Sequence, residues 1–286
     1  MAYKLALIGH NLSHSLSPVI QKAGLDSLGL DGTYEILDTP PEDLISRIKY
    51  LKGNGYNGFN VTIPLKVPMG LFLDHVDKHA DIAGCVNTVK ILEDRTFFGY
   101  NTDIYGFKKA IPVKIQQKLK GANVSILGTG GASRAAAVGL IELGVSEVDF
   151  YSRNIINSSP LINYLRKNFP NVTFKLYQIQ QTRDLSNTAM LVNTTPIGMR
   201  GNSMDQMPIE FEAIKKLNKE AFVYDVIYNP TNTVLLEKAQ QCGLETINGL
   251  DMFINQAAKA LEIWTGKVPD ADKMKIAALE SLARTN

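Results

Sequence analysis

Two ionisable residues in the first part of the chain have neighbours that suit proton transfer. Lys66 follows residues 60–65, which are typical of a strand ending in a proline-locked turn, and most of its neighbours are apolar. Such surroundings disfavour the charged form of a lysine and suit it to exchanging a proton near neutral pH. Asp103 ends the run 101–103, which is typical of a helix N-terminus. Each residue alone also fits an ordinary alternative, a surface lysine and a helix cap.

Two serine hydroxyls, on Ser15 and Ser17, stand two residues apart just before the expected start of a helix at Pro18. Hydroxyl groups beside the free N–H groups of a helix N-terminus can hold a carboxylate or a phosphate. Helix capping and loop polarity explain the same residues equally well. No serine lies in a nucleophile-elbow pattern, so covalent catalysis by serine is not expected.

Residues 123–144 organise the second part of the chain. An apolar run ends at Gly128, and an Ala/Leu/Ile-rich helix is expected from there to Gly144. Strand, glycine loop and helix in this order open a dinucleotide-binding unit, in which Gly128 makes the turn and Gly130 lets a pyrophosphate approach the helix N-terminus. Ser133 stands where a third glycine is usual and is small enough for close packing of helix and strand. A tight turn without a ligand is the alternative.

The loop after the next expected strand, which ends at Tyr151, indicates which dinucleotide is bound. Folds that prefer NAD usually place an Asp or Glu there to accept a hydrogen bond from the ribose. Residues 152–157 contain no carboxylate and include Arg153, whose guanidinium can pair with a 2′-phosphate. The loop therefore predicts NADP, with a solvated surface arginine as the alternative.

Composition argues against several other classes of protein. Of the 286 residues 45% are hydrophobic and 20% charged, and the net charge is +2, which favours neither nucleic-acid nor membrane binding. Cys85 and Cys242 are too few for a disulfide framework, so a soluble cytoplasmic protein with reduced thiols is expected. His75 and His79 have the i, i+4 spacing of helical metal ligands but lack the other residues of a zinc motif, so a solvated helix face and no metal are predicted.

Two regions of alternating strands and helices must position these residues. Strands are expected over 5–8, 33–37, 58–63, 86–91 and 96–100, the last two as a hairpin that makes the sheet mixed, with helices from Pro18 and over 41–51. A helix over 104–111 and a polar linker over 114–121 follow. Strands over 124–127, 148–151, 172–176, 190–193, 222–227 and 246–247 then predict a doubly wound, Rossmann-type sheet.

The predicted fold is therefore α/β with two domains. A substrate-binding catalytic domain with a mixed sheet is expected over residues 1–113, and a Rossmann-type NADP-binding domain over 114–249. Two further helices are expected over 252–265 and 272–283. We expect this last part, residues 250–286, to return to the first domain.

Several segments taken together resemble the shikimate dehydrogenase family across nearly the whole chain. Their order along the chain is more specific than any one of them. They are Ser-His-Ser-Leu-Ser-Pro at 13–18, Asn-Val-Thr-Ile-Pro-Leu-Lys at 60–66, Ala-Gly-Cys-Val-Asn-Thr at 83–88, Tyr-Asn-Thr-Asp at 100–103, Gly-Thr-Gly-Gly-Ala-Ser-Arg at 128–134, Asn-Thr-Thr-Pro-Ile-Gly-Met at 193–199, Tyr-Asp-Val-Ile-Tyr-Asn-Pro at 224–230 and Gly-Leu-Asp-Met at 249–252.

The resemblance implies the reversible reduction of 3-dehydroshikimate to shikimate by NADPH, in aromatic amino acid biosynthesis. It implies that Lys66 transfers the proton, paired with Asp103. Ser15 and Ser17 would hold the substrate carboxylate. The ring hydroxyls would be surrounded by Thr62, Asn87, Asp103 and Gln256, with Tyr228 nearby.

The same resemblance implies a set of cofactor-binding residues: Gly128, Thr129, Gly130, Gly131, Ala132, Ser152, Arg153, Asn154, Val226 and Gly249. Residues 152–154 read Ser-Arg-Asn where the family often has Asn-Arg-Thr, so only the arginine carries over cleanly. Val226 stands at a position that varies in type among relatives. No residue is implied to bind a metal.

Two alternatives stay open at this point. A quinate/shikimate dehydrogenase could use NAD or both cofactors, although such relatives tend to carry an acidic residue soon after the arginine and residues 154–159 contain none. A non-catalytic nucleotide sensor could use the same scaffold, but would have no need of Lys66 and Asp103 beside a pair of serines. The expected partner is a small-molecule substrate, and the chain is expected to be a monomer or a homodimer.

Overall fold

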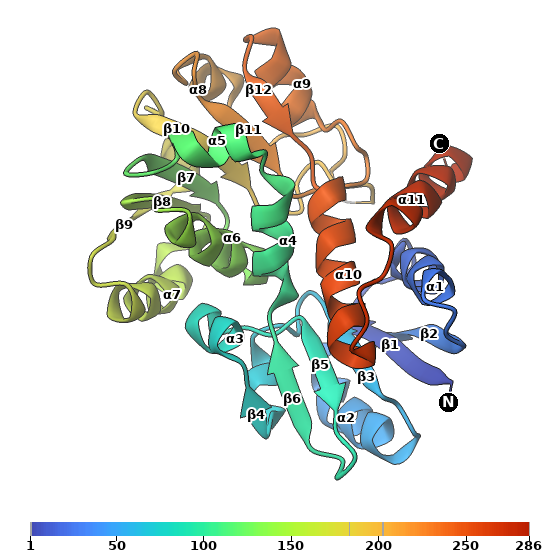
Figure 1. Cartoon of the computed structure of the whole chain (residues 1–286). Helices are drawn as coiled ribbons and strands as arrows, with labels where there is room; N and C mark the ends of the chain where they lie inside the picture. The colour runs from blue at the N-terminus through green and yellow to red at the C-terminus, as the bar shows by residue number, and fades with distance from the viewer. Residues whose placement is uncertain (1, 183, 202, 286) are drawn as a thin grey trace. The chain divides into compact units, whose positions relative to one another are not determined.

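The computed structural model describes residues 2–182, 184–201 and 203–285, and the chain divides into two compact units. Unit 1 comprises Met1–Gly106 with Ile254–Asn286, and unit 2 comprises Phe107–Phe253. Each unit contains one six-stranded sheet with helices packed against it (Figure 1). The predicted α/β class is confirmed.

The sheet of unit 1 is mixed, as the sequence predicts. Its strand order is β2-β1-β3-β5-β6-β4. Strands β1, β2 and β3 are parallel, while β5 is antiparallel to both β3 and β6. The strands are β1 (Tyr3–Gly9), β2 (Gly32–Asp38), β3 (Gly58–Val61), β4 (His75–Val76), β5 (Thr88–Ile91) and β6 (Phe97–Tyr100).

This topology decides where the polar segments of unit 1 meet. Parallel strands end at the same edge of a sheet, and an antiparallel neighbour begins at that edge. The carboxyl ends of β1, β3 and β6 therefore share an edge with the start of β5. The candidate catalytic residues lie in segments that leave or enter the sheet at this edge.

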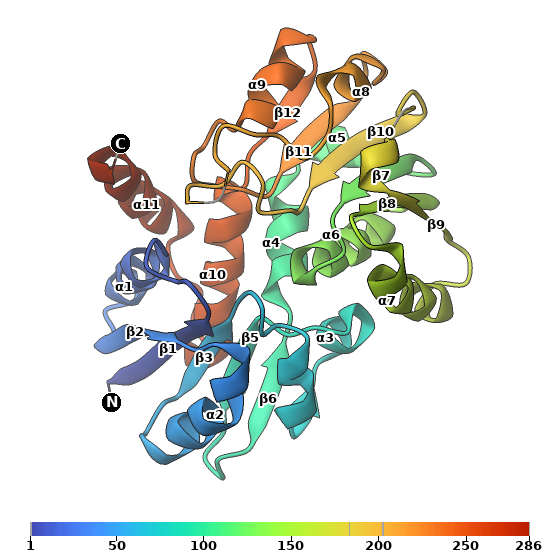
Figure 2. The same ribbon diagram turned by 180° about the vertical axis from the view of Figure 1, so that it is seen from behind.

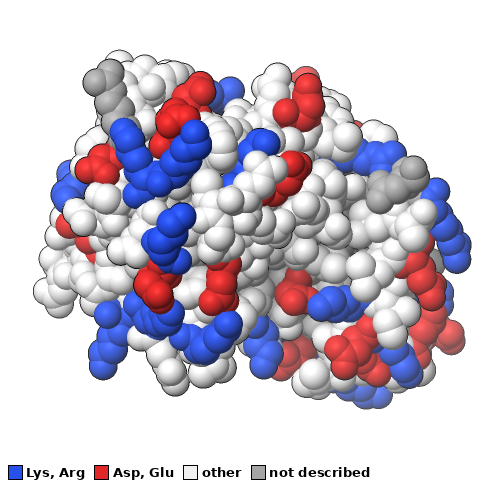
Figure 3. Space-filling model, turned by 90° about the horizontal axis from the view of Figure 1, so that it is seen from above, with Lys and Arg blue, Asp and Glu red and all other residues white. Residues whose placement is uncertain are grey.

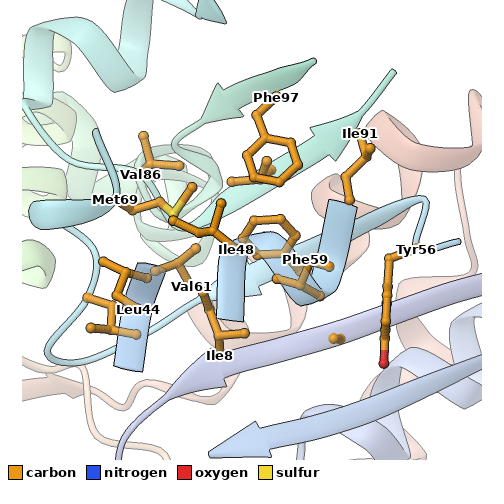
Figure 4. Close-up of a cluster of buried hydrophobic side chains, with 14 of the residues drawn as sticks. Ile8, Leu44, Ile48, Tyr56, Phe59, Val61, Met69, Val86, Ile91 and Phe97 are labelled. Carbon is orange, nitrogen blue, oxygen red and sulfur yellow. The ribbon is translucent and has the colours of Figure 1, made fainter. Parts of the chain in front are cut away.

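A cluster of apolar side chains fills the space between one face of this sheet and α2 (Leu44–Gly53) (Figure 4). Phe59 of β3 and Phe97 of β6 meet edge to face, with ring centroids 5.4 Å apart. Ile48 of α2 belongs to the same cluster. Alternate residues of β3 and β5 point into it because side chains alternate between the faces of a strand.

The C-terminal helices complete unit 1. Helix α11 (Ala271–Thr285) runs beside α1 (Ser17–Ser27) (Figure 1, Figure 2). In α10 (Leu250–Thr265), Trp264 donates a hydrogen bond from its indole N–H to the carbonyl of Val89, at 2.9 Å. These contacts join residues far apart in the sequence within one compact unit.

The other helices that contribute to unit 1 are α3 (Lys78–Ala83) and the start of α4 (Thr102–Ala110), and the 3₁₀ turns are Pro41–Asp43 and Pro68–Phe72.

Unit 2 has a fully parallel, doubly wound sheet, as predicted. Its strand order is β12-β11-β10-β7-β8-β9, so the order reverses between β7 and β10. Ligands of such sheets bind beyond the carboxyl ends of the strands near this reversal. The strands are β7 (Asn123–Leu127), β8 (Glu147–Ser152), β9 (Thr173–Gln178), β10 (Thr188–Asn193), β11 (Phe222–Asp225) and β12 (Glu245–Ile247). The helices are α5 (Val113–Lys118), α6 (Gly131–Glu142), α7 (Ile155–Asn168), α8 (Phe211–Lys215) and α9 (Val234–Gln241), with a 3₁₀ turn at Ile179–Gln181.

Three local expectations are wrong. Residues 114–121 are not simply a polar linker, because α5 covers Val113–Lys118 and buries Ile115. The helix expected over 41–51 begins with a 3₁₀ turn and becomes α-helical only at Leu44. His75 and His79 do not share a helix, since His75 belongs to the short strand β4 and His79 to α3.

Three further observations concern the surface charge, the length of the helices and the side chains that could bind a metal. On the face drawn in Figure 3, basic and acidic side chains are interspersed. Within the described part of the chain, none of the helices combines the length and the apolar character needed to cross a membrane. Over the same residues, no three His, Cys, Asp or Glu side chains are grouped so as to hold a metal ion.

We expect Gly58→Ala to destabilise unit 1. A Cβ at this position would lie 2.2 Å from the indole nitrogen of Trp264 and 2.7 Å from the carbonyl oxygen of Val89, so the strand or the indole must shift. Overpacking of this kind costs about 1–3 kcal/mol. Urea unfolding followed by the fluorescence of Trp264, the single tryptophan, measures this loss of stability.

Gly53→Ala is the control. Gly53 lies in α2, and a Cβ there would have no neighbour within 4 Å, so this variant should be neutral or stabilised by up to about 1 kcal/mol. Equal midpoints for the two variants would contradict the packing argument.

Candidate active site

The sheet edge of unit 1 brings Lys66 and Asp103 together although they are 37 residues apart in the sequence. Lys66 follows the end of β3, and Asp103 lies in the first turn of α4, directly after β6. The Lys66 Nζ donates to the Asp103 Oδ2 at 2.5 Å, and the two side chains are only 14% and 7% exposed. Asn101 caps α4 by accepting from the N–H of Ile104 at 3.3 Å. Both alternatives drawn from the sequence are therefore excluded: Lys66 is not a surface lysine, and Asp103 is more than a helix cap.

Asn87 joins this ion pair from the start of β5. Its Nδ2 donates to the Asp103 Oδ1 at 2.9 Å and to the Gln256 Oε1 of α10 at 3.3 Å. Its Oδ1 accepts from the backbone N–H of Thr102 at 2.7 Å, which fixes which end of the amide faces the carboxylate. Four residues proposed from the resemblance, Lys66, Asn87, Asp103 and Gln256, thus form one hydrogen-bonded group.

The other substrate-binding candidates of unit 1 lie at the ends of β1 and β3. The Ser15 hydroxyl donates to the Ser17 hydroxyl at 3.1 Å and accepts from the Ser17 N–H at 3.3 Å, and both side chains are partly exposed. Ser17 is the first residue of α1, as expected. Thr62 is partly exposed, its methyl group packs against Gly9, and its hydroxyl makes no hydrogen bond to the described residues. In the described chain, no hydrogen bond links these three side chains to the Lys66–Asp103 pair.

In unit 2, the glycine loop follows β7 as predicted. Gly128 has φ +104, a left-handed conformation that favours glycine, and its N–H donates to the carbonyl of Tyr151 at 2.8 Å. A Cβ at Gly130 would meet nothing within 4 Å, so the backbone at the start of α6 faces open space. Ser133 is fully buried and its hydroxyl lies 2.6 Å from that of Thr194, which confirms the close packing expected of it. An accessible helix N-terminus behind a glycine turn fits a bound pyrophosphate.

The loop after β8 presents Arg153 to solvent. The side chain is exposed and makes no hydrogen bond or ion pair to the described residues. Its neighbours have structural roles: the buried Ser152 hydroxyl lies 2.6 Å from that of Ser158, and Asn154 caps α7 by accepting from the Asn157 N–H at 3.0 Å. An unpaired guanidinium without a nearby carboxylate in its loop fits the 2′-phosphate of NADP.

Two cofactor candidates lie side by side after β11 and β12. A Cβ at Gly249 would come within 2.0 Å of the Val226 carbonyl oxygen, so this glycine is required by the crossing of two backbones, whatever it binds. Val226 is partly exposed, and its N–H donates to the carbonyl of Asn193 at 3.0 Å. Tyr228 stacks on Phe253, with ring centroids 4.1 Å apart. The remaining candidates, Thr129, Gly131 and Ala132, lie in the loop or the first turn of α6.

Sequence reasoning gave no role to Asp225, a buried carboxylate at the end of β11. It is 0% exposed and has no lysine or arginine among its hydrogen-bond partners in the described chain. Thr233 donates to its Oδ2 at 2.7 Å, and Asn193 and the N–H of Ile227 donate to its Oδ1 at 3.1 Å each. Burial raises the pKa of Asp225 to about 6, and these hydrogen bonds oppose the shift. Asp225 thereby ties the end of β10 to the segment that carries Val226 and Tyr228.

The buried Asp225 should make stability depend on pH. Between its ordinary pKa of 3.8 and the folded value of about 6, the unfolded chain has lost this proton while the native chain retains it. Its contribution to the free energy of unfolding therefore falls as pH rises through this interval, by a total on the order of 3 kcal/mol. Asp225→Asn keeps the shape and should flatten this dependence in urea unfolding from pH 4 to 7. The exposed Asp205→Asn should leave the dependence unchanged. A slope that survives in Asp225→Asn would exclude this carboxylate as its source.

Comparison with known proteins agrees with this geometry. The family model for the shikimate dehydrogenase substrate binding domain matches residues 7–89, and that for the shikimate 5'-dehydrogenase C-terminal domain matches residues 249–279. The chain is 37% identical over 269 residues to a shikimate dehydrogenase (NADP(+)) of Caldanaerobacter subterraneus subsp. tengcongensis, covering 93% of this chain and 92% of the relative.

Two solved structures share the whole fold. A shikimate 5-dehydrogenase of Thermus thermophilus, in complex with NADP(H) and shikimate, has a TM-score of 0.81 and 35% identity, over 98% of this chain and 99% of the other. A quinate dehydrogenase of Corynebacterium glutamicum, in complex with NAD, has a TM-score of 0.87 and 28% identity, over 98% of this chain and 99% of the other. With a glycine loop, a buried lysine–aspartate pair and this degree of identity over almost its entire length, the chain belongs to the shikimate dehydrogenase family.

Proposed function

We propose that this chain is an oxidoreductase that interconverts shikimate and 3-dehydroshikimate with NADP. The observation that carries the proposal is the hydrogen-bonded group of Lys66, Asp103 and Asn87 at the sheet edge of unit 1. A buried ammonium beside a carboxylate can exchange a proton with a substrate hydroxyl and stabilise the negative charge that develops on its oxygen. The reaction belongs to aromatic amino acid biosynthesis.

The roles of the residues in unit 1 follow from their chemistry. In the reducing direction Lys66 gives its proton to the carbonyl oxygen, and in the oxidising direction neutral Lys66 takes the proton from the hydroxyl. Asp103 orients the ammonium and accepts a hydrogen bond from a ring hydroxyl. Asn87, Gln256 and the unpaired hydroxyl of Thr62 supply further partners for ring hydroxyls. Ser15 and Ser17 bind the substrate carboxylate through their hydroxyl groups.

In unit 2 we assign NADP to the residues around the carboxyl ends of the strands. When bound, the cofactor supplies the hydride that reduces the carbonyl carbon. The loop from Gly128 to Ala132 holds the pyrophosphate, with Ser152, Arg153 and Asn154 at the 2′-phosphate, and Val226 and Gly249 beside the nicotinamide. Tyr228 is assigned to substrate binding. We propose the domain limits 1–113, 114–249 and 250–286, a cytoplasmic location, and a monomeric or homodimeric enzyme.

A quinate/shikimate dehydrogenase that uses NAD is the second candidate, favoured by the 28% identity to a quinate dehydrogenase bound to NAD. The exposed Arg153, with no carboxylate over residues 152–159, argues against it. Reduction of NADP and of NAD, followed by absorbance of the reduced nicotinamide with shikimate and with quinate, separates the two candidates. An inactive protein in all four mixtures would instead indicate a nucleotide sensor.

Lys66→Met should lower kcat about 10²–10⁴-fold, because it keeps the length of the side chain and removes the transferable proton. The KM for NADP should remain near the wild-type value. Lys22→Met is a matched control, since it breaks another lysine–aspartate pair of unit 1, with Asp26, that is exposed. A folded Lys66→Met protein with near-native kcat would show that this lysine is not the proton-transfer residue.

Arg153→Asp should raise the KM for NADP roughly tenfold to a hundredfold, because a charge-assisted pair is replaced by repulsion of the 2′-phosphate. The KM for NAD should change much less. Lys120→Asp makes the same charge change at another exposed position of unit 2 and should affect neither constant. If NADP binds equally well to the Arg153 variant, the 2′-phosphate is held elsewhere.

A further inference from the structure

A row of polar side chains, which is buried from Asn60 onward, leads from Tyr34 of β2 to the Asp103 carboxylate. The Tyr34 hydroxyl donates to the Asn60 Oδ1 at 2.7 Å. The Asn60 Nδ2 donates to the Thr88 hydroxyl at 3.0 Å and to the carbonyl of Asn87 at 3.1 Å. The Thr88 hydroxyl donates to the Asn87 Oδ1 at 3.2 Å, and the Asn87 Nδ2 donates to the Asp103 Oδ1 at 2.9 Å. Five residues from β2, β3, the start of β5 and α4 are thus connected in series.

Strand register explains why these side chains meet. Asn60 of β3 is paired with Thr88 of β5, and Thr88 is paired in turn with Tyr100 of β6. Asn60, Asn87 and Thr88 are 6%, 2% and 0% exposed. Water cannot replace a missing partner at such positions, so each donor and acceptor depends on the neighbouring side chain.

The hydrogen bonds of the row all point in one direction. The Asn60 Oδ1 already receives two donors, the Tyr34 hydroxyl and, at 3.5 Å, the Gln21 Nε2. The amide of Asn60 must therefore present its Nδ2 to Thr88. The Thr88 hydroxyl accepts from that group and has two neighbours of its own, the Asn87 Oδ1 at 3.2 Å and the Thr102 hydroxyl at 3.1 Å, and its donation to Asn87 continues the row. An Asn87 amide that receives at its oxygen donates more strongly from its nitrogen, because hydrogen bonds in a chain polarise one another.

The orientation of the Gln21 side-chain amide is consistent with this direction of the hydrogen bonds. Its side chain is 1% exposed, and its Oε1 has no donor among the described residues. Turning the Gln21 amide over would place its oxygen against the Asn60 oxygen, so the observed orientation follows from that of Asn60.

We propose that Thr88 and Asn60 are positioning residues for the proton-transfer pair: the Thr102 N–H fixes which end of the Asn87 amide faces Asp103, and the hydrogen bonds of Thr88 and Asn60 hold that amide in place so that it orients the Asp103 carboxylate against Lys66. This inference rests on the proposed function for its effect on turnover. The residues themselves touch neither reacting group. Their effect passes through Asn87, so it falls on the rate of the chemical step and not on cofactor binding.

Thr88→Val tests the inference, because valine has the shape of threonine without the hydroxyl. We expect kcat for shikimate oxidation to fall about tenfold, with the KM for NADP unchanged. Thr88→Ser restores the hydroxyl and should recover most of the lost kcat. Thr33→Val is the matched control, an exposed threonine of β2 in the same sheet, and should behave as wild type.

A second measurement does not require turnover. Acetylation of Lys66 by acetic anhydride, followed by mass spectrometry, reports how firmly Asp103 holds the ammonium. Lys66 should be acetylated several-fold faster in Thr88→Val than in wild type or Thr88→Ser. If the wild-type protein fails to oxidise shikimate, the proposed function is wrong and this labelling still decides the positioning role.

Wild-type kcat together with wild-type labelling in Thr88→Val would overturn the inference, and so would a loss of kcat that Thr88→Ser does not recover. Tyr34→Phe covers the case in which Thr88→Val does not fold. It removes the first donor of the row and keeps the ring, which lies 6.5 Å from that of Trp264. Tyr34→Phe should lower kcat by a smaller factor than Thr88→Val, because Gln21 still donates to Asn60. An unchanged kcat together with unchanged Lys66 labelling in Tyr34→Phe would also count against the proposal.

Discussion

The arrangement of the candidate site in unit 1 depends on how the protein stabilises one buried negative charge, that of Asp103. A carboxylate removed from water is costly unless cations and hydrogen-bond donors surround it. The Asp103 side chain is 7% exposed and meets this requirement at both oxygens, with the Lys66 ammonium at one and the Asn87 amide at the other. The sheet topology makes these contacts possible, because β3 and β6 end at the edge where β5 begins. The requirement to hold a charge and the geometry for proton transfer are therefore met by the same contacts.

Unit 2 also contains a buried carboxylate, Asp225, but different groups stabilise it. Asp225 is buried without a cation among its described hydrogen-bond partners and is held by neutral donors from Thr233, Asn193 and a backbone N–H. Neutral donors compensate an ionised carboxylate less well than a lysine does, so burial raises its pKa. Both carboxylates stand at strand ends beside segments that we assign to ligands, but only Asp103 has an ammonium proton beside it.

The sequence predicts the architecture well because strand and helix periodicity are local. The mixed sheet, the hairpin, the glycine turn and the doubly wound order are all confirmed. The errors fall on short or polar elements: β4 has two residues, and α5 buries only Ile115, so neither has a periodic pattern to detect. Pairing of Lys66 with Asp103 came from the family resemblance and not from spacing, since 37 residues separate them. The roles of Asn60 and Asp225 depend on strand register and on partners up to 39 residues away, which no local pattern contains.

The one-way row of hydrogen bonds from Tyr34 to Asp103 also constrains how the sequence can diverge. The Thr102 N–H fixes the orientation of the Asn87 amide, so a substitution at Asn60 or Thr88 does not turn that amide over but leaves a buried donor or acceptor of the row without its partner. An apolar replacement at Asn60 or Thr88 is therefore costly even when volume is conserved, whereas the apolar residues behind them tolerate such exchanges. The demands of the proton-transfer pair on the sequence therefore extend to two residues, Asn60 and Thr88, that make no hydrogen bond to that pair in the described chain.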